Sequence, residues 1–239
     1  AILNHSMTGM KTPTQKIINM KKSIKKMETE HESQKLLLQH LTQMERMTED
    51  LTEASQHGGL AKCLECLKKG VSANEPDSAG YLPLHYAASN GHADVAKLLL
   101  EYGADPSSYL TGHSSIEMAA RHGYTDIVKT IIYFGGSTED KGLRGSTPLV
   151  SAATGNYMET VVALLNAGAD IQGTNLEENT ALHEATALEN PVPLIRLLLK
   201  RGADITSINR DGHTPVRKAI ANANALAVDA LGGRAAMVD

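Results

Sequence analysis

The chain has few of the large aromatic rings that often fill a protein core. Among its 239 residues there is no tryptophan and one phenylalanine, and aromatic residues make up 3% of the sequence. Its hydrophobic content of 41% is nevertheless ordinary for a soluble protein, so leucine, alanine, isoleucine and valine must provide the packing. This composition favours thin helices that pack closely through small, repeated interfaces.

Net charge and cysteine are also scarce. The formal charge is -4 and the isoelectric point is near 6.2, so the chain lacks the basic surplus that attracts phosphate backbones, and no nucleic-acid partner is expected. Cys63 and Cys66 are the only cysteines, too few for a disulfide-stapled secreted scaffold and typical of a reducing compartment. We therefore expect an intracellular protein, either cytoplasmic or nuclear.

Long apolar runs are absent from the sequence as well. None reaches the roughly 18 residues of a membrane-spanning helix, and the polar start lacks the apolar stretch of a secretory signal. The chain begins at Ala1 without a methionine, and we interpret residues 1–13 as a flexible start or an expression remnant. Residues 232–239 are interpreted as a tail.

What the sequence does contain is a recurring phrase. Gly-Tyr-Leu-Pro-Leu-His-Tyr-Ala-Ala at 80–88 is echoed at 112–120 and 145–153, and more weakly at 179–185 and 212–219. The equivalent apolar residues are spaced by 32, 33, 33 and 34 positions, and they are Leu84, Ile116, Leu149, Leu182 and Val216. The closing glycines agree, with spacings of 33, 32, 33 and 34, at Gly70, Gly103, Gly135, Gly168 and Gly202. A period of this size indicates a repeat protein.

These residues resemble the ankyrin repeat, which has a period of about 33 residues and the hallmark Thr-Pro-Leu-His-x-Ala. The resemblance covers about six units between Leu51 and Leu231. It implies an all-α repeat solenoid, a stack of helix-turn-helix units with turn or hairpin tips. The residues that match the signature, and for which it implies a structural role, are Pro83, Leu84, His85, Pro148, Leu149, His183 and Pro215.

Local rules agree with this architecture. Thr147 and Thr214 are placed to cap a helix whose first residue is the proline that follows. Paired alanines let neighbouring units approach closely, and a glycine ends each second helix. Three places depart from the pattern: Ser115-Ile116-Glu117 replaces Pro-Leu-His, the loop at 189–193 is longer, and the segment 224–231 is rich in alanine.

The segment 14–50 contains neither glycine nor proline and is predicted to be one long helix. Its apolar residues begin a heptad pattern at Ile17 and Met20, but His31 and Gln34 interrupt it, so a coiled coil is weakly supported. Three interpretations stay open: a cap on the first repeat, a homodimer through residues 14–50, and a disordered arm.

Lysines are concentrated in this segment, with no acidic residue among them before Glu28. A basic amphipathic helix can bind anionic lipid or calmodulin, and the alternative is a solvated helix face. A membrane partner is considered only through this segment. The lysines are Lys11, Lys16, Lys21, Lys22, Lys25 and Lys26.

No catalytic, cofactor or metal site emerges from the sequence. The cysteines have the spacing of a metal pair, but a structural zinc site needs about four ligands, so we interpret them as buried thiols on a second helix. His113 and His213 lie beside turn glycines and are expected to be solvent-facing, and no nucleophile motif accompanies them. We therefore expect no enzyme activity from this chain.

The resemblance implies a protein-binding module that recognises a protein or peptide segment through its tips and first-helix faces. Tyrosine and arginine dominate interface energies, which favours Tyr81, Tyr86, Tyr109, Arg121 and Arg144. Two alternatives are a targeting or regulatory domain of a larger enzyme or pathogen effector, and a scaffold oligomerised by the N-terminal helix. The full candidate set adds Ser78, Ser89, Asn90, Thr111, Met118, His122, Leu143, Ser151, Thr154, Glu177, Glu178, Arg210 and Asp211.

Overall fold

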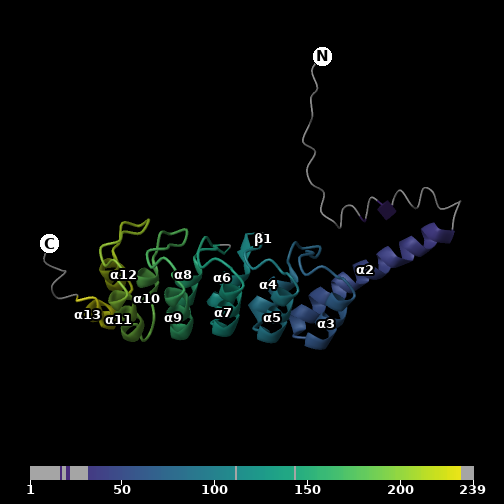
Figure 1. The fold of residues 1–239 in the computed structure, drawn as a ribbon. Helices are drawn as coiled ribbons and strands as arrows, with labels where there is room; N and C mark the ends of the chain where they lie inside the picture. Colours follow the sequence, from purple (N-terminus) through teal and green to yellow (C-terminus); the bar gives the residue numbers. More distant parts are fainter. Residues whose placement is uncertain (1–16, 18–19, 22–31, 111, 143, 233–239) are drawn as a thin grey trace, which may run out of the picture.

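The computed structural model describes residues 17, 20–21, 32–110, 112–142 and 144–232. It shows a row of helix pairs joined by loops that gather along one edge (Figure 1). The described elements are α2 (Glu32–His57), α3 (Leu60–Lys68), α4 (Pro83–Asn90), α5 (Ala93–Glu101), β1 (Tyr109–Leu110), β2 (His113–Ser114), α6 (Ser115–Arg121), α7 (Thr125–Tyr133), α8 (Pro148–Thr154), α9 (Met158–Asn166), α10 (Ala181–Ala185), α11 (Val192–Lys200), α12 (Pro215–Ala221) and α13 (Ala225–Ala230).

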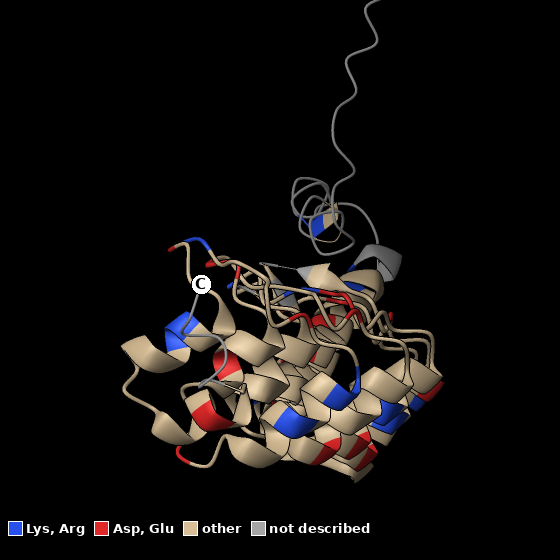
Figure 2. Cartoon of the chain, turned by 90° about the vertical axis from the view of Figure 1, so that its left-hand side faces the viewer, with Lys and Arg blue, Asp and Glu red and all other residues tan. Residues whose placement is uncertain are grey.

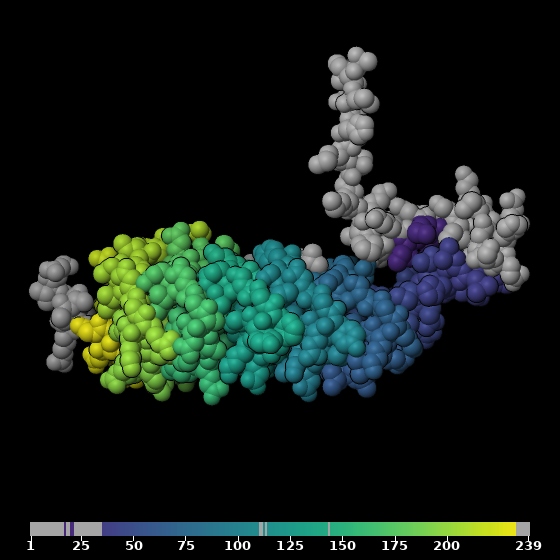
Figure 3. Space-filling view, in the orientation of Figure 1, coloured from purple at the N-terminus to yellow at the C-terminus, as the bar shows by residue number. Residues whose placement is uncertain are grey.

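Each helix packs on its counterparts in the units before and after it. Helix α4 contacts α2, α5 and α6, and α5 contacts α3 and α7, so the stack has an inner row of first helices and an outer row of second helices. The result is an elongated, continuous body (Figure 3). The predicted all-α solenoid is confirmed, and the only strands in the described ranges are the two-residue antiparallel pair β1 and β2 at one tip.

The predicted helix starts are also confirmed. Thr147 accepts a hydrogen bond at Oγ1 from the backbone N–H of Val150, and Thr214 accepts one from Arg217, both at 3.4 Å. The prolines that follow these threonines are the first residues of α8 and α12, where a missing N–H removes no helical hydrogen bond. In unit three, where Ser115 replaces the proline, Ser114 provides the cap for α6.

Small residues set the distance between units. Ala87, Ala88, Ala119 and Ala120 are completely buried between neighbouring first helices. Because alanine loses no side-chain rotamer freedom, these contacts form without an entropic cost for the side chain. The core is therefore continuous along the row rather than divided among separate units.

A ring from each of three units covers a glycine of the unit before. The glycines Gly58 and Gly91 have positive φ, and a Cβ atom built on either would lie 2.7 Å from the ring of His92 or Tyr124, respectively. Tyr157 covers Gly123 in the same way. These contacts require glycine for the backbone conformation and for the close approach of the ring.

The N-terminal boundary differs from the sequence interpretation in one respect. Residues 14–50 and the first repeat were expected to be separate segments, but α2 runs without a break across residues 50 and 51. One helix therefore includes both the end of the N-terminal segment and the first helix of unit one, where Met47, Leu51 and Ala54 are buried. Residues 1–13, most of 14–31 and 233–239 lie outside the described residues.

The C-terminal end is less covered than the interior. Ile220 occupies the position of Ala88, Ala120 and Ala153, all fully buried, yet its side chain is 46% exposed. The final helix α13 has 6 residues, compared with 9 in α11. No described helix has the length and apolar character needed to cross a membrane.

Candidate functional site

The tips and first helices form the surface on which partner-binding residues were predicted. Viewed from the C-terminal end of the row, the tip loops lie together along one edge above the helices (Figure 2). Most of the predicted residues are exposed there, namely Ser78, Asn90, Tyr109, Arg121, His122, Arg144, Thr154, Glu177, Glu178, Arg210 and Asp211. Thr111 and Leu143 lie outside the described residues.

Met118 and Ser151 are corrections to that prediction. Each is only 7% exposed, so neither presents a side chain to a partner. Met118 packs into the core, and Ser151 donates a hydrogen bond from Oγ to Oε1 of Glu117 at 2.7 Å. Both residues lie on first helices, but their side chains are buried rather than exposed on the surface.

Tyr81 and Tyr86 of unit two are only partly exposed and hold the tip loop in place. Tyr86 is half-buried and donates its hydroxyl to Oδ2 of Asp77 at 2.6 Å. Oδ1 of Asp77 accepts the backbone N–H groups of Ala79 and Tyr81, each at 2.9 Å. Burial, reinforced by the Asp77 hydrogen bond, raises the pKa of Tyr86 to about 12. The Tyr81 ring packs against Tyr86 and His85, so these residues fix the loop.

The exposed surface of units three and four includes two arginines and one tyrosine. Arg121, His122 and Arg144 are exposed, and the Tyr109 side chain is 57% exposed. Within the described ranges no ion pair engages either arginine, whereas Arg210 lies 3.9 Å from Glu178. Guanidinium groups without an internal carboxylate partner are available to bind carboxylates of another molecule.

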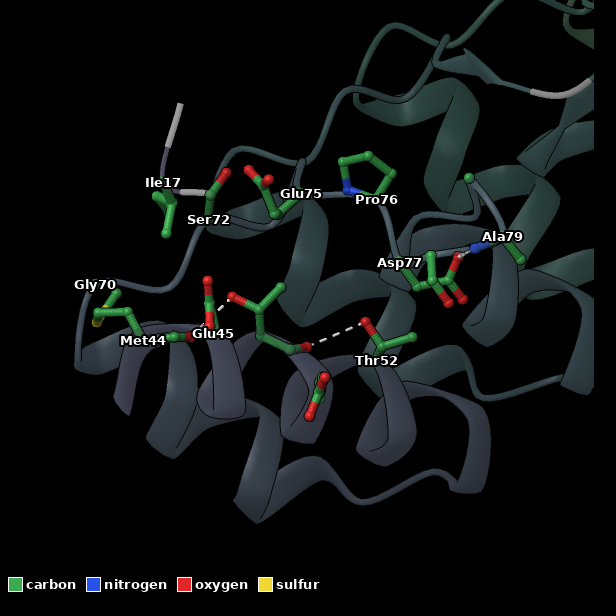
Figure 4. A pocket seen from close by; sticks show the side chains of 14 residues that line it. Ile17, Met44, Glu45, Thr52, Gly70, Ser72, Glu75, Pro76, Asp77 and Ala79 are labelled. Atoms are coloured by element: carbon green, nitrogen blue, oxygen red, sulfur yellow. Dashed lines mark hydrogen bonds between the residues drawn. The ribbon is translucent and has the colours of Figure 1, made fainter. Parts of the chain in front are cut away.

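A cavity of about 740 Å³ lies at the N-terminal end of this surface, between α2 and the loop 70–80 (Figure 4). Among the described residues its walls carry four carboxylates, from Glu45, Glu49, Glu75 and Asp77, and no basic side chain. This cavity was not predicted from the sequence, and Ser78 is the one predicted residue among its described lining. The available signal was a pair of glutamates one helical turn apart, followed by two acids in the next loop.

The signature histidines have the structural role that the resemblance implied. Nδ1 of His183 accepts the backbone N–H of Thr180 at 3.2 Å, and Nε2 lies 3.0 Å from the carbonyl oxygen of His213. This geometry fits a neutral ring with its proton on Nε2, donated to the next unit. Burial lowers the pKa of His183 from its ordinary value, against the hydrogen bond to His213. His85 is held similarly: its Nδ1 accepts the backbone N–H of Leu82 at 3.1 Å, and its Nε2 lies 3.4 Å from the carbonyl oxygen of Ser108.

The two thiols are completely buried on α3, as predicted. Burial raises the pKa of both Cys63 and Cys66, which keeps them as thiols and opposes nucleophilic chemistry. Over the part of the chain that the structure describes, no group of three or more His, Cys, Asp or Glu side chains is placed to hold a metal ion.

A family model described as ankyrin repeats in three copies matches residues 30–110, 51–142 and 116–209. The chain belongs to the ankyrin-repeat family. Repeats of this family are protein-interaction modules, and their fold is generally non-catalytic. The identified family thus agrees with the helix pairs and with the tip surface described above.

Similar proteins place these repeats in different contexts. A stretch of 57 residues, 23% of this chain, is 42% identical to 8% of the mouse 2-5A-dependent ribonuclease. The chain spans less than a third of the length of the first relatives that it matches. The crystal structure of EF0377, an ankyrin repeat protein, aligns with 77% of this chain and 97% of its own at 25% identity, with a TM-score of 0.72.

A second solved structure includes a protein partner. It is the predatory endopeptidase Bd0816 from Bdellovibrio bacteriovorus in complex with the immunity protein Bd3460. The matched chain is 28% identical, with a TM-score of 0.70 over 77% of this chain and 96% of the other.

Proposed function

We propose that this chain is a rigid adaptor that binds an acidic segment of a partner protein across units three and four. The observation that supports the proposal most directly is that Tyr109, Arg121 and Arg144 are all exposed on units three and four, and that neither arginine has an ion-pair partner within the described residues. An interface draws most of its energy from a few such residues. We name this group the basic face.

The rigidity of the stack favours this function. The basic face rests on α6 and on the loops beside it, and the helix underneath is anchored by the buried Ile116, Ala119 and Ala120. A surface that is already ordered loses little conformational freedom on binding, so more of the interaction energy appears as affinity. The partner segment supplies carboxylates for the two guanidinium groups and an apolar group for the tyrosine ring.

The experiment is affinity capture followed by a binding measurement with the captured partner. The double variant Arg121→Glu, Arg144→Glu is expected to lower affinity at least about 100-fold, because each attractive contact becomes repulsive. Arg196→Glu, Lys200→Glu is the matched control, since it makes the same charge change on exposed positions of α11. Equal affinity of the two double variants would refute a role for the basic face.

A regulatory or targeting domain of a larger enzyme is the second candidate. It is favoured by the similarity to the 2-5A-dependent ribonuclease, of which this chain covers only 8%. The basic face would then bind a substrate or regulator of the enzyme rather than join two partners. The discriminating observation is the gene sequence on either side of these residues, which either encodes a catalytic domain or does not.

A scaffold assembled through the N-terminal helix is the third candidate. The exposed Leu36 and Leu37 on α2 support it, since apolar side chains on a helix can pair between chains. Mass measurement in solution tests the idea directly. A dimeric mass that becomes monomeric in Leu36→Ser, Leu37→Ser supports it, and a monomeric wild-type chain removes it.

A further inference from the structure

The acidic cavity beside α2 is lined by carboxylates that differ in their availability. Both oxygens of Asp77 already accept hydrogen bonds from its own loop and from Tyr86. Thr48 and Thr52 donate their hydroxyl groups back to α2. Glu45 and Glu49 are not engaged by the cavity wall in this way, and they lie one helical turn apart on the same side of the helix.

Acidic side chains from two segments line the described part of this cavity. Loop 70–80 adds Glu75 opposite the two glutamates of α2, and none of the described residues that line the cavity is a lysine, arginine or histidine. A concave site lined by charges of one sign concentrates its potential and attracts ions of the opposite sign. The cavity is therefore suited to bind a lysine ammonium group from a segment that also carries an apolar side chain.

A short stretch of the same chain already presents these two groups to the cavity. Ile17 lines it, and Nζ of Lys21 forms an ion pair with Oε2 of Glu45 across 24 positions of sequence. Residues 17, 20 and 21 are helical, so Ile17 and Lys21, four residues apart, point to one side. Figure 4 shows Ile17 on the loop side of the cavity, with Met44 and Glu45 beneath it on α2.

We propose that the acidic cavity is a binding site for a lysine-bearing helical segment, and that the chain's own stretch around Ile17 and Lys21 is its resident ligand. Lys21 provides the charge for Glu45, and Ile17 adds an apolar side chain to the cavity that Met44 also lines. The surrounding sequence adds five further lysines between positions 11 and 26 and no acid, which complements the cavity. This site is separate from the basic face and opposite to it in charge.

The site places Ile17 and Lys21 beside the helix that begins the first unit. Because the ligand and the site belong to one chain, the ligand is present at a high effective concentration. A separate peptide of the same sequence must compete with the resident stretch. Removing the resident contact should therefore open the cavity to the peptide.

The test titrates a fluorescent peptide with the sequence of residues 11–27 into the full chain and follows its anisotropy. We expect Lys21→Glu in the protein to bind the peptide at least about tenfold more tightly than the wild type, because the resident stretch no longer competes. Adding Glu45→Lys, Glu49→Lys to that variant should remove the binding. A peptide that itself carries glutamate in place of Lys21 should not bind.

Two controls separate site binding from general charge effects. Lys35→Glu makes the same charge change at an exposed position of α2 outside the cavity and should leave the affinity of the peptide at the wild-type value. Arg121→Glu, Arg144→Glu should also leave it unchanged, so loss of the adaptor function and loss of this site are distinguishable. Thermal melting monitored by circular dichroism verifies that each variant is folded.

Equal peptide affinity for the wild-type and Lys21→Glu proteins would overturn the assignment of the resident ligand. Peptide binding that survives reversal of both glutamates would overturn the site itself. If Lys35→Glu enhances binding as much as Lys21→Glu, the effect is attraction to the whole acidic chain and the proposal fails as well.

Discussion

The interior units and the last unit share repeat positions but differ in burial. Val161 of α9 and Val228 of α13 each lie four residues after the cap of their helix, yet Val161 is completely buried and Val228 is half-buried. The same holds for Ala120 and Ile220 on first helices. A repeat position therefore has no fixed energetic value, because burial comes from the units on both sides.

The largest expected effect compares the two valines directly. Val161→Ala should lower the free energy of unfolding by about 2–3 kcal/mol, since it removes fully buried methyl groups and leaves a cavity. Val228→Ala makes the same chemical change at the partly exposed end and should cost less than about 1 kcal/mol. Urea denaturation measures both. Equal losses would show that the last unit is as well packed as the interior.

An intermediate effect concerns the joint between units five and six. His183→Ala should cost about 1–2 kcal/mol at pH 7.5, because it leaves the carbonyl oxygen of His213 and the N–H of Thr180 without their ring partner. Thermal or urea denaturation of the two proteins at this pH measures the difference. If only the last two units lose stability, the difference in packing between the end of the stack and its interior becomes clearer.

The same histidine predicts a pH dependence. The pKa of buried His183 is lowered from 6.5, so the unfolded chain binds a proton there more readily than the folded chain. Its stabilising contribution is complete above pH 6.5 and is lost as the pH falls from 6.5 through the folded pKa. The neighbouring charges Lys218 and Glu184 are the same in both proteins. The difference in free energy of unfolding between wild type and His183→Ala should therefore become smaller as the pH falls. A difference that grows instead would contradict this assignment.

The smallest expected effect is at the exposed end of the first-helix row. Ile220→Ala should change stability by less than about 0.5 kcal/mol, because the side chain is 46% exposed and alanine favours helix. Ala120→Ile, the reverse exchange at the buried position, should cost about 1–3 kcal/mol by overpacking. Denaturation curves of the two variants test whether burial alone separates these positions.

Periodicity was sufficient to predict the fold, since a spacing near 33 residues fixes which side chains meet. Thr147 and His183 could be assigned their structural roles because those roles are local or recur in every unit. Surface position was harder to predict. Met118 and Ser151 share a repeat position with Tyr86, but whether a side chain turns outward depends on its size and on neighbours such as Glu117.

The acidic cavity was beyond the repeat pattern for a different reason. Glu45 belongs to a segment outside the six units, and its partner Lys21 lies 24 positions away. Periodicity relates equivalent positions of successive units, and it contains no information about how a non-repeating segment folds back. The proposed partner-binding residues depend on a second molecule, so this sequence alone identifies candidates for them and not their ligand.

The rings that cover glycines form the same contact at three successive boundaries between units, always from the later unit to the earlier one. His92 covers Gly58, Tyr124 covers Gly91 and Tyr157 covers Gly123, so units two and three each carry a covered glycine and a ring that covers the glycine of the unit before. Deleting one whole period between Gly91 and Gly123 would leave each remaining glycine covered by the ring of the next unit. A deletion of any other length would move the rings away from the glycines. Chains of this kind can thus lengthen or shorten by complete units while the joints stay the same.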